Sequence, residues 1–193
     1  MAVAVPLILA SASPRRQQLL REAGYAFTVD PADIDEETAG RSLLPIELAL
    51  HLATLKARAV APRHPDAVTL AADTVVALGD RSLGKPATPD EARRMLELLE
   101  GTTHIVITGV CVACPGRGVE LARRVMSAVR MRRLGRKDID RYVATRQWEG
   151  KAGGYGIQDD DPFVTNMAGS LTNIVGLPME ATCAMLGEAG VKA

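Results

Sequence analysis

Residues 3–16 read VAVPLILASASPRR, and this stretch decides the fold class. Its first part is an apolar, β-rich run, which predicts a buried central strand over residues 3–10. Ser13 can then cap a helix, and Pro14 suits its first position, so a helix is expected over residues 14–23. A buried strand, a short loop and a capped helix in succession indicate the opening of an α/β unit.

The rest of the chain continues this alternation. Apolar or β-rich runs predict strands at residues 25–29, 68–78, 104–114 and 119–131. Apolar stripes and capping residues predict helices at residues 45–61, 89–100, 137–145 and 178–186. The predicted class is α/β, or α+β with a mixed sheet, in one domain over residues 1–193.

Composition excludes several classes of protein. Lys and Arg total 23, as do Asp and Glu, and aromatic residues make up only 3%, which argues against a nucleic-acid-binding surface. Three cysteines, an odd number, fit a reducing cytosol better than a disulfide framework. The apolar opening is too short and lacks the basic flank of a signal peptide, and no apolar run is long enough to cross a membrane.

The loop and helix after the first strand suit an anion. A helix N-terminus carries unpaired N–H groups and partial positive charge, which favour a phosphate. Arg15 and Arg16 in the first turn oppose that dipole unless an anion binds there and uses their guanidinium donors. The alternative is an ordinary cap at Ser13 followed by two solvated arginines.

Two carboxylates are candidate metal ligands. Asp73 interrupts the apolar run LAADTVV at residues 70–76, where a buried charge must be paired or bound to a metal. The alternative for Asp73 is a carboxylate satisfied by backbone donors. Glu36 lies in an acidic loop that, taken alone, reads as a solvated turn. Because Mg²⁺ takes one or two carboxylates plus phosphate oxygens, Glu36 and Asp73 can hold it together.

Two lysines and a glutamine complete the candidates. Lys85 lies between Gly84 and Pro86, which fix the backbone around it and suit a lysine directed at phosphate. Lys56 lies one position beyond the apolar stripe of its helix, where a surface lysine is the simpler interpretation. A glycine-rich loop spans residues 150–156, and Gln158 follows it. The Gln158 amide can hydrogen-bond to the edge of a base or to the loop backbone.

Five motifs in this order resemble one family, the Maf (septum formation inhibitor) family. Each motif is weak alone, but the set is specific and extends from about residue 7 to residue 186. The motifs are Ser11-Ala12-Ser13-Pro14-Arg15-Arg16, Ala72-Asp73-Thr74-Val75, Gly84-Lys85-Pro86, Lys151-Ala152-Gly153-Gly154-Tyr155-Gly156-Ile157-Gln158 and Val175-Gly176-Leu177-Pro178.

The resemblance implies a two-lobed fold with a central cleft, related to the inosine triphosphate pyrophosphatases, and a cytoplasmic homodimer. It implies hydrolysis of a nucleoside triphosphate to the monophosphate and pyrophosphate. Glu36 and Asp73 would hold Mg²⁺ or Mn²⁺, and Asp73 would be the general base for the attacking water. The matching phosphate-binding positions are Ser11, Arg15, Arg16, Lys56 and Lys85.

The resemblance also separates substrate classes. Arg15, Thr74 and Gln158 match the branch that acts on dTTP and UTP, with 7-methyl-GTP as the alternative substrate. Modified pyrimidine nucleotides are further candidates. Two departures bear on substrate preference. Asp159 follows the glutamine, within the run DDDP, where the family usually has Gly, and Leu171 stands where an aromatic residue is common.

A protein of another class, a nucleotide-binding regulator of cell division without turnover, remains the rival hypothesis. It would need the phosphate-binding residues but not the metal carboxylates. Because Glu36 and Asp73 are both present, the sequence favours the enzyme. The sequence leaves open an exchange of roles between these two carboxylates.

Overall fold

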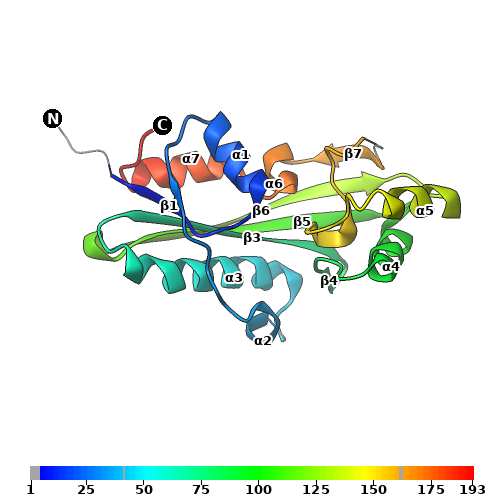
Figure 1. Ribbon diagram of the computed structural model, residues 1–193, viewed down its shortest axis with the longest axis horizontal. Coiled ribbons are helices and arrows are strands. Elements are labelled where there is room, and N and C mark those ends of the chain that lie inside the picture. The colour runs from blue at the N-terminus through cyan, green and yellow to red at the C-terminus, as the bar shows by residue number, and fades with distance from the viewer. Residues whose placement is uncertain (1–4, 41, 161–162) are drawn as a thin grey trace.

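The computed structural model describes residues 5–40, 42–160 and 163–193. The predictions that involve Val3, Ala4, Asp161 and Pro162 therefore lie outside the described residues. Within them, seven strands form one mixed sheet in the order β2-β1-β3-β5-β6-β7, with β4 also paired to β3 (Figure 1). The predicted mixed-sheet α/β class is confirmed.

The strands and helices have the following bounds. The strands are β1 Leu7–Leu9, β2 Thr28–Val29, β3 Val68–Leu78, β4 Arg81–Leu83, β5 Thr103–Cys114, β6 Val119–Met131 and β7 Val164–Ala168. The α-helices are α1 Pro14–Glu22, α2 Glu36–Gly40, α3 Pro45–Val60, α4 Pro89–Leu99, α5 Arg136–Ala144, α6 Leu171–Val175 and α7 Met179–Glu188. Short 3-10 turns are η1 Ala61–Arg63, η2 Pro115–Arg117 and η3 Ala152–Gly154.

Helices cover both faces of the sheet. Figure 1 shows α3 on one face and α1, α6 and α7 on the other. Successive strand residues point to opposite faces, and β3 follows this rule. Leu70 belongs to the core that holds Leu20 of α1 and Met185 of α7, whereas Ala71 packs with Ala57 of α3.

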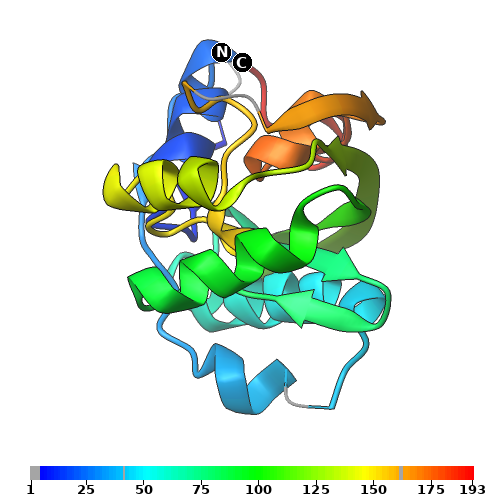
Figure 2. The same ribbon diagram turned by 90° about the vertical axis from the view of Figure 1, so that its right-hand side faces the viewer.

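A second core lies at the other end of the sheet. There α4 and α5 pack on the far ends of β3, β5 and β6, and Figure 2 views the molecule from this end. Val76 and Val106 of the strands join Leu96 of α4, Tyr142 of α5 and Tyr155 in this core. The sheet therefore carries packed cores at both ends, which is compatible with the two-lobed fold that the resemblance implies.

The edge of β3 that faces β1 and β4 is interrupted. β1 pairs in parallel with residues Val68, Thr69 and Leu70, and β4 pairs antiparallel with Val76, Ala77 and Leu78. In the part of the chain that the structure describes, no strand pairs with residues 71–75 on this edge. The interruption lies between the two cores and leaves the middle of a central strand accessible from one side.

Several short elements differ from the prediction. The strand expected at residues 25–29 is reduced to Thr28–Val29, because Tyr25 and Phe27 pack into the core without pairing to a strand. The acidic stretch expected as a loop contains α2, which begins at Glu36, and Asp35 Oδ1 accepts a hydrogen bond from Thr38 N at 3.1 Å. The elements β4, β7 and α6 were not predicted.

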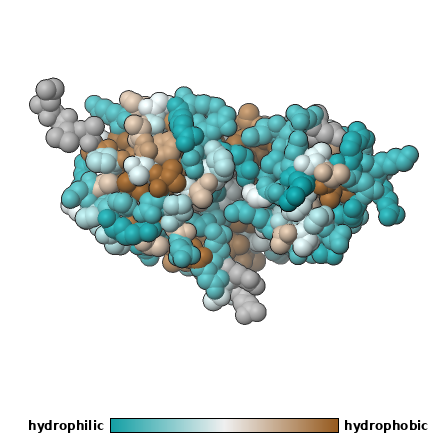
Figure 3. All heavy atoms as spheres, viewed as in Figure 1, coloured by the Kyte–Doolittle hydropathy of each residue, from teal (hydrophilic) through white to brown (hydrophobic). Residues whose placement is uncertain are grey.

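Among the described residues, no helix is long and apolar enough to cross a bilayer. The face shown in Figure 3 is mainly hydrophilic, with smaller apolar areas.

Candidate active site

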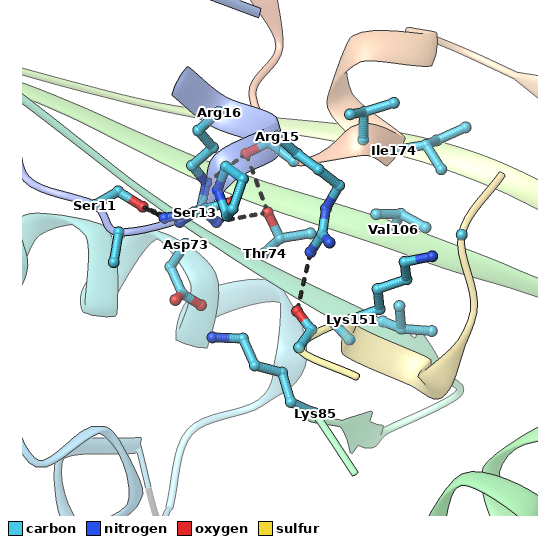
Figure 4. Close-up of a pocket in the computed structure, with 18 of the residues that line it drawn as sticks. Ser11, Ser13, Arg15, Arg16, Asp73, Thr74, Lys85, Val106, Lys151 and Ile174 are labelled. Carbon is cyan, nitrogen blue, oxygen red and sulfur yellow. Dashed lines mark hydrogen bonds between the residues drawn. The ribbon is translucent and has the colours of Figure 1, made fainter. Parts of the chain in front are cut away.

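A cavity of about 470 Å³ lies between the two cores (Figure 4). Its lining comes from the loop before α1 and the first turn of α1, from α2, α3, β3, β5, α6 and the segment after β4, and from the glycine-rich loop around η3. All nine residues that the sequence singled out line this cavity: Ser11, Arg15, Arg16, Glu36, Lys56, Asp73, Thr74, Lys85 and Gln158.

Asp73 and Thr74 reach the same cavity from opposite faces of the sheet. As neighbours on β3 they point in opposite directions. Asp73 contacts α3 through Lys56, whereas Thr74 contacts Arg16 of α1. Both line one cavity because the edge of β3 is open at this point.

Lys56 is the centre of a buried charge cluster. Its Nζ lies 2.6 Å from Asp73 Oδ1 and 2.8 Å from Glu36 Oε1, and Lys56 and Asp73 are each only 7% exposed. The interpretation of Lys56 as a surface lysine is therefore wrong. A buried ammonium needs paired carboxylates, and the two carboxylates supply them.

A glycine on β5 lets α3 come close enough for this contact. Gly109 is the cross-strand neighbour of Asp73, and a Cβ placed on it would lie 2.3 Å from the Ala49 carbonyl oxygen of α3. Any larger residue would push the helix outward. The close approach brings Lys56 over the strand that carries Asp73.

Glu36 is held in its ionised form. Burial raises the pKa of Glu36, but the hydrogen bond from Lys56, the charge of Lys56 and the more distant charges of Lys85 and Arg16 outweigh burial, so its pKa is lowered. Glu36 therefore carries a negative charge at neutral pH, as a metal ligand must.

The carboxylate pair fits a hard divalent cation. Glu36 and Asp73 each place an oxygen within hydrogen-bonding distance of the same Lys56 nitrogen, so they converge on one small volume beside the cavity. Among the described residues, no three His, Cys, Asp or Glu side chains gather in one place. An ion here would complete its shell with water and with phosphate oxygens of a ligand, which is the usual arrangement for Mg²⁺.

Arg16 is fixed by three acceptors from three parts of the chain. Its guanidinium donates to the Gly176 carbonyl oxygen at 2.8 Å, to Ser11 Oγ at 3.1 Å and to Thr74 Oγ1 at 3.1 Å. Burial lowers the pKa of Arg16, and the nearby Asp73 carboxylate partly offsets this. An arginine stays charged under such a shift, so Arg16 is a rigid cation beside the cavity.

The helix cap differs in detail from the prediction. Ser13 occupies the N-cap position of α1, but its side chain makes no capping hydrogen bond. Instead, its backbone N–H donates to Ser11 Oγ at 3.3 Å. The Ser13 hydroxyl therefore does not cap the helix.

Arg15, Lys85 and Gln158 lie around the rim. Arg15 Nη2 donates to the Gly150 carbonyl oxygen at 2.9 Å, which ties α1 to the glycine-rich loop. Lys85 is exposed, and Figure 4 shows its side chain directed toward Asp73. Gln158 is exposed on the rim of the cavity. These three side chains are in place to contact a ligand.

The glycine-rich loop contains an ion pair that the sequence did not predict. Asp159 accepts hydrogen bonds from Lys151 Nζ, from Tyr142 Oη at 2.6 Å and from Gly156 N at 2.8 Å. A Cβ on Gly156 would lie 2.6 Å from Asp159 Oδ1 and 2.8 Å from Lys151 Nζ, so a side chain here would displace the ion pair. The sequence has Asp159 where the family usually has glycine, and the structure shows that Lys151 pairs with this carboxylate.

The fold and the site together define an α/β protein with a cleft that carries a guanidinium cation and a carboxylate pair. The chain belongs to the Maf family, because the family model described as Maf-like protein matches residues 6–189. The dTTP/UTP pyrophosphatase of Hyphomonas neptunium is 50% identical over 189 residues, which cover 97% of each chain. The dTTP/UTP pyrophosphatase of Anaeromyxobacter dehalogenans is 48% identical over 187 residues, which cover 95% of this chain and 94% of the relative.

Among solved structures, a HAM1 protein from Coxiella burnetii aligns with 68% of this chain and 75% of its own, at 19% identity and a TM-score of 0.48. This likeness is too weak to add to the family assignment.

Proposed function

We propose that this protein is a nucleoside triphosphate pyrophosphatase that hydrolyses dTTP and UTP to the monophosphate and pyrophosphate. The observation that carries the proposal is the convergence of Asp73, Glu36 and Lys56 beside the fixed guanidinium of Arg16 in one cavity. Relatives named dTTP/UTP pyrophosphatase, about half identical over nearly the whole chain, support the choice of substrate.

The cations bind and orient the triphosphate. Arg16 is already held by three acceptors, so it loses little freedom when a phosphate binds, and fixed donors of this kind stabilise charge that develops on phosphate oxygens. Ser11, Arg15 and Lys85 complete the phosphate-binding set in the proposal. Thr74 supports Arg16 from the strand below.

Asp73 acts on the attacking water. Its carboxylate accepts a proton as the water oxygen bonds to the α-phosphorus, and the bond from that phosphorus to the bridging oxygen breaks. Pyrophosphate leaves with the bridging oxygen. Lys56 holds the Asp73 carboxylate in place through its 2.6 Å hydrogen bond.

We further propose that Glu36 and Asp73 hold Mg²⁺ or Mn²⁺ during the reaction. Bound there, such an ion would neutralise triphosphate charge and help to align the phosphate for attack. The support is the fit of the converging carboxylates to an oxygen-ligated cation. The expectation of a homodimer rests on the resemblance alone, and that of a cytoplasmic location on the resemblance and the cysteine content; both stay predictions.

Pyrophosphate release by the purified protein tests the proposal. We expect release from dTTP and UTP with Mg²⁺ or Mn²⁺ and its loss after chelation with EDTA. Asp73→Asn should lower kcat by roughly a hundredfold to ten-thousandfold, while Asp80→Asn in the exposed turn after β3 should not.

Near-normal turnover of the Asp73→Asn variant would show that Asp73 is not the base, and Glu36→Gln would then test the exchange of roles. Release from 7-methyl-GTP alone would keep the reaction and overturn the substrate. No release from any nucleotide, with the protein folded, would favour the binding protein without turnover.

A further inference from the structure

Lys151 provides a cation at the end of the cavity away from the charge cluster. Figure 4 shows Lys151 on the opposite side of the cavity from Asp73, with Val106 and Ile174 also lining that side. Lys151 precedes η3, whose Gly153 lies so close to Val76 that an added Cβ would be 3.1 Å from its side chain. Apolar side chains make this end suitable for a flat base.

Asp159 fixes the position of this ammonium. The Lys151 and Asp159 side chains are only 14% and 7% exposed, and Asp159 is itself anchored by Tyr142 and Gly156. An ammonium has three N–H donors. Within the described ranges, the Lys151 ammonium donates a hydrogen bond to Asp159 and to no other protein group. Further N–H donors of the ammonium therefore remain for a ligand in the cavity.

We infer that Lys151, positioned by Asp159, is a specificity-determining residue that donates a hydrogen bond to the O4 carbonyl of uracil or thymine. The inference rests on the proposed function, which places the phosphates at the Asp73 end of the cavity. O4 is on the edge of the ring far from the sugar, and Lys151 is at the end of the cavity far from Asp73. Cytosine carries an amino group at this position. Its N–H donors would face the N–H donors of Lys151, and no hydrogen bond could form.

A role for Lys151 in phosphate binding fits the structure less well. Lys56 contacts both members of the carboxylate pair, and the charges of Lys85 and Arg16 also act on Glu36. Figure 4 shows Arg16 and Lys85 on the Asp73 side of the cavity, away from Lys151. In addition, the Asp159 carboxylate cancels the charge of Lys151, which weakens a phosphate site but leaves a directional donor. Discrimination of a carbonyl from an amino group needs only the donor.

Binding of α,β-methylene-UTP and α,β-methylene-CTP, measured by calorimetry with Mg²⁺, tests the inference without requiring turnover. We expect the wild-type protein to bind the uridine analogue more tightly. Lys151→Met keeps the length of the side chain and removes its donors, so the ratio of the two affinities should fall roughly tenfold to a hundredfold. Lys137→Met, at an exposed position of α5, is the matched control and should keep the ratio.

Asp159→Asn should give a smaller fall in the ratio, because asparagine can still accept from Tyr142 and Gly156 but no longer pairs with the ammonium. An equal loss of affinity for both analogues in Lys151→Met would show a structural role only and overturn the inference. So would binding of neither analogue by the wild type. Tight, selective binding without pyrophosphate release would instead contradict the proposed function and support the inference.

Discussion

The pH dependence of protein stability tests whether His104 is buried in its neutral form. It lies on β5, is 1% exposed, and its Nε2 is 2.6 Å from the Tyr155 hydroxyl in the glycine-rich loop. In the described part of the chain its Nδ1 has no hydrogen-bond partner. Burial therefore lowers the pKa of His104 from 6.5 to about 4, because the charged imidazolium would lose its hydration.

The sign and size of the pH effect follow from this shift. Above pH 6.5 the imidazole is neutral in both the folded and the unfolded chain, so His104 imposes no pH-dependent cost. Between pH 6.5 and about 4 only the unfolded chain takes up the proton, so the free energy of unfolding falls as the pH falls. The loss should reach about 2 kcal/mol between about pH 7 and about pH 5, and about 3 kcal/mol once both states are protonated.

His104→Gln keeps a nitrogen near the Tyr155 hydroxyl and removes the titration. Urea unfolding of the wild type and the variant over this pH range measures both free energies of unfolding, and their difference isolates His104 from the carboxylates. We expect this difference to shrink by about 2 kcal/mol from about pH 7 to about pH 5. His51→Gln on the exposed side of α3 is the matched control. A difference that does not change with pH would refute the argument.

Two further substitutions test the geometry of the site. Gly109→Ala should lower the free energy of unfolding in urea by about 1–3 kcal/mol, because the new methyl group would meet the Ala49 carbonyl of α3. Gly187→Ala, in open space on α7, should leave this free energy unchanged or raise it. An equal effect of the two changes would contradict the close approach of α3. Arg16→Lys should lower kcat/KM for dTTP by roughly tenfold to a hundredfold, because lysine cannot bond the three acceptors of the guanidinium at once. Pyrophosphate release near the wild-type rate would show that the fork geometry is not needed.

Local signals predicted the main elements and several residues of the cavity lining, and the family resemblance supplied others. The strand, loop and helix at the N-terminus follow from an apolar run and a proline, and the structure has β1 at Leu7–Leu9 and α1 at Pro14–Glu22. Asp73 stood out because a charge inside an apolar strand must have a partner. Such signals depend on neighbouring residues alone, and the sequence displays them directly.

The partners of these residues could not be predicted in the same way. The position of Lys56 in the sequence shows which face of its helix it occupies. It does not show that the Asp73 carboxylate of β3 lies against that face. Likewise, Asp159 reads as an added charge until the fold brings Tyr142 and Lys151 to it. The short elements β4 and α6 have too few residues to show a period, and contacts with neighbouring elements stabilise them.

The interrupted edge of β3 has a consequence for what a ligand can do to the sheet. The Leu70 carbonyl oxygen accepts from Ala10 N on the β1 side, so the backbone groups of Ala72 and Thr74, two and four residues on, point toward the same edge. No strand takes them up there in the described ranges. Over this short stretch a central strand therefore behaves as a sheet edge, and a molecule that reached these backbone groups from the cleft would take the place of a strand.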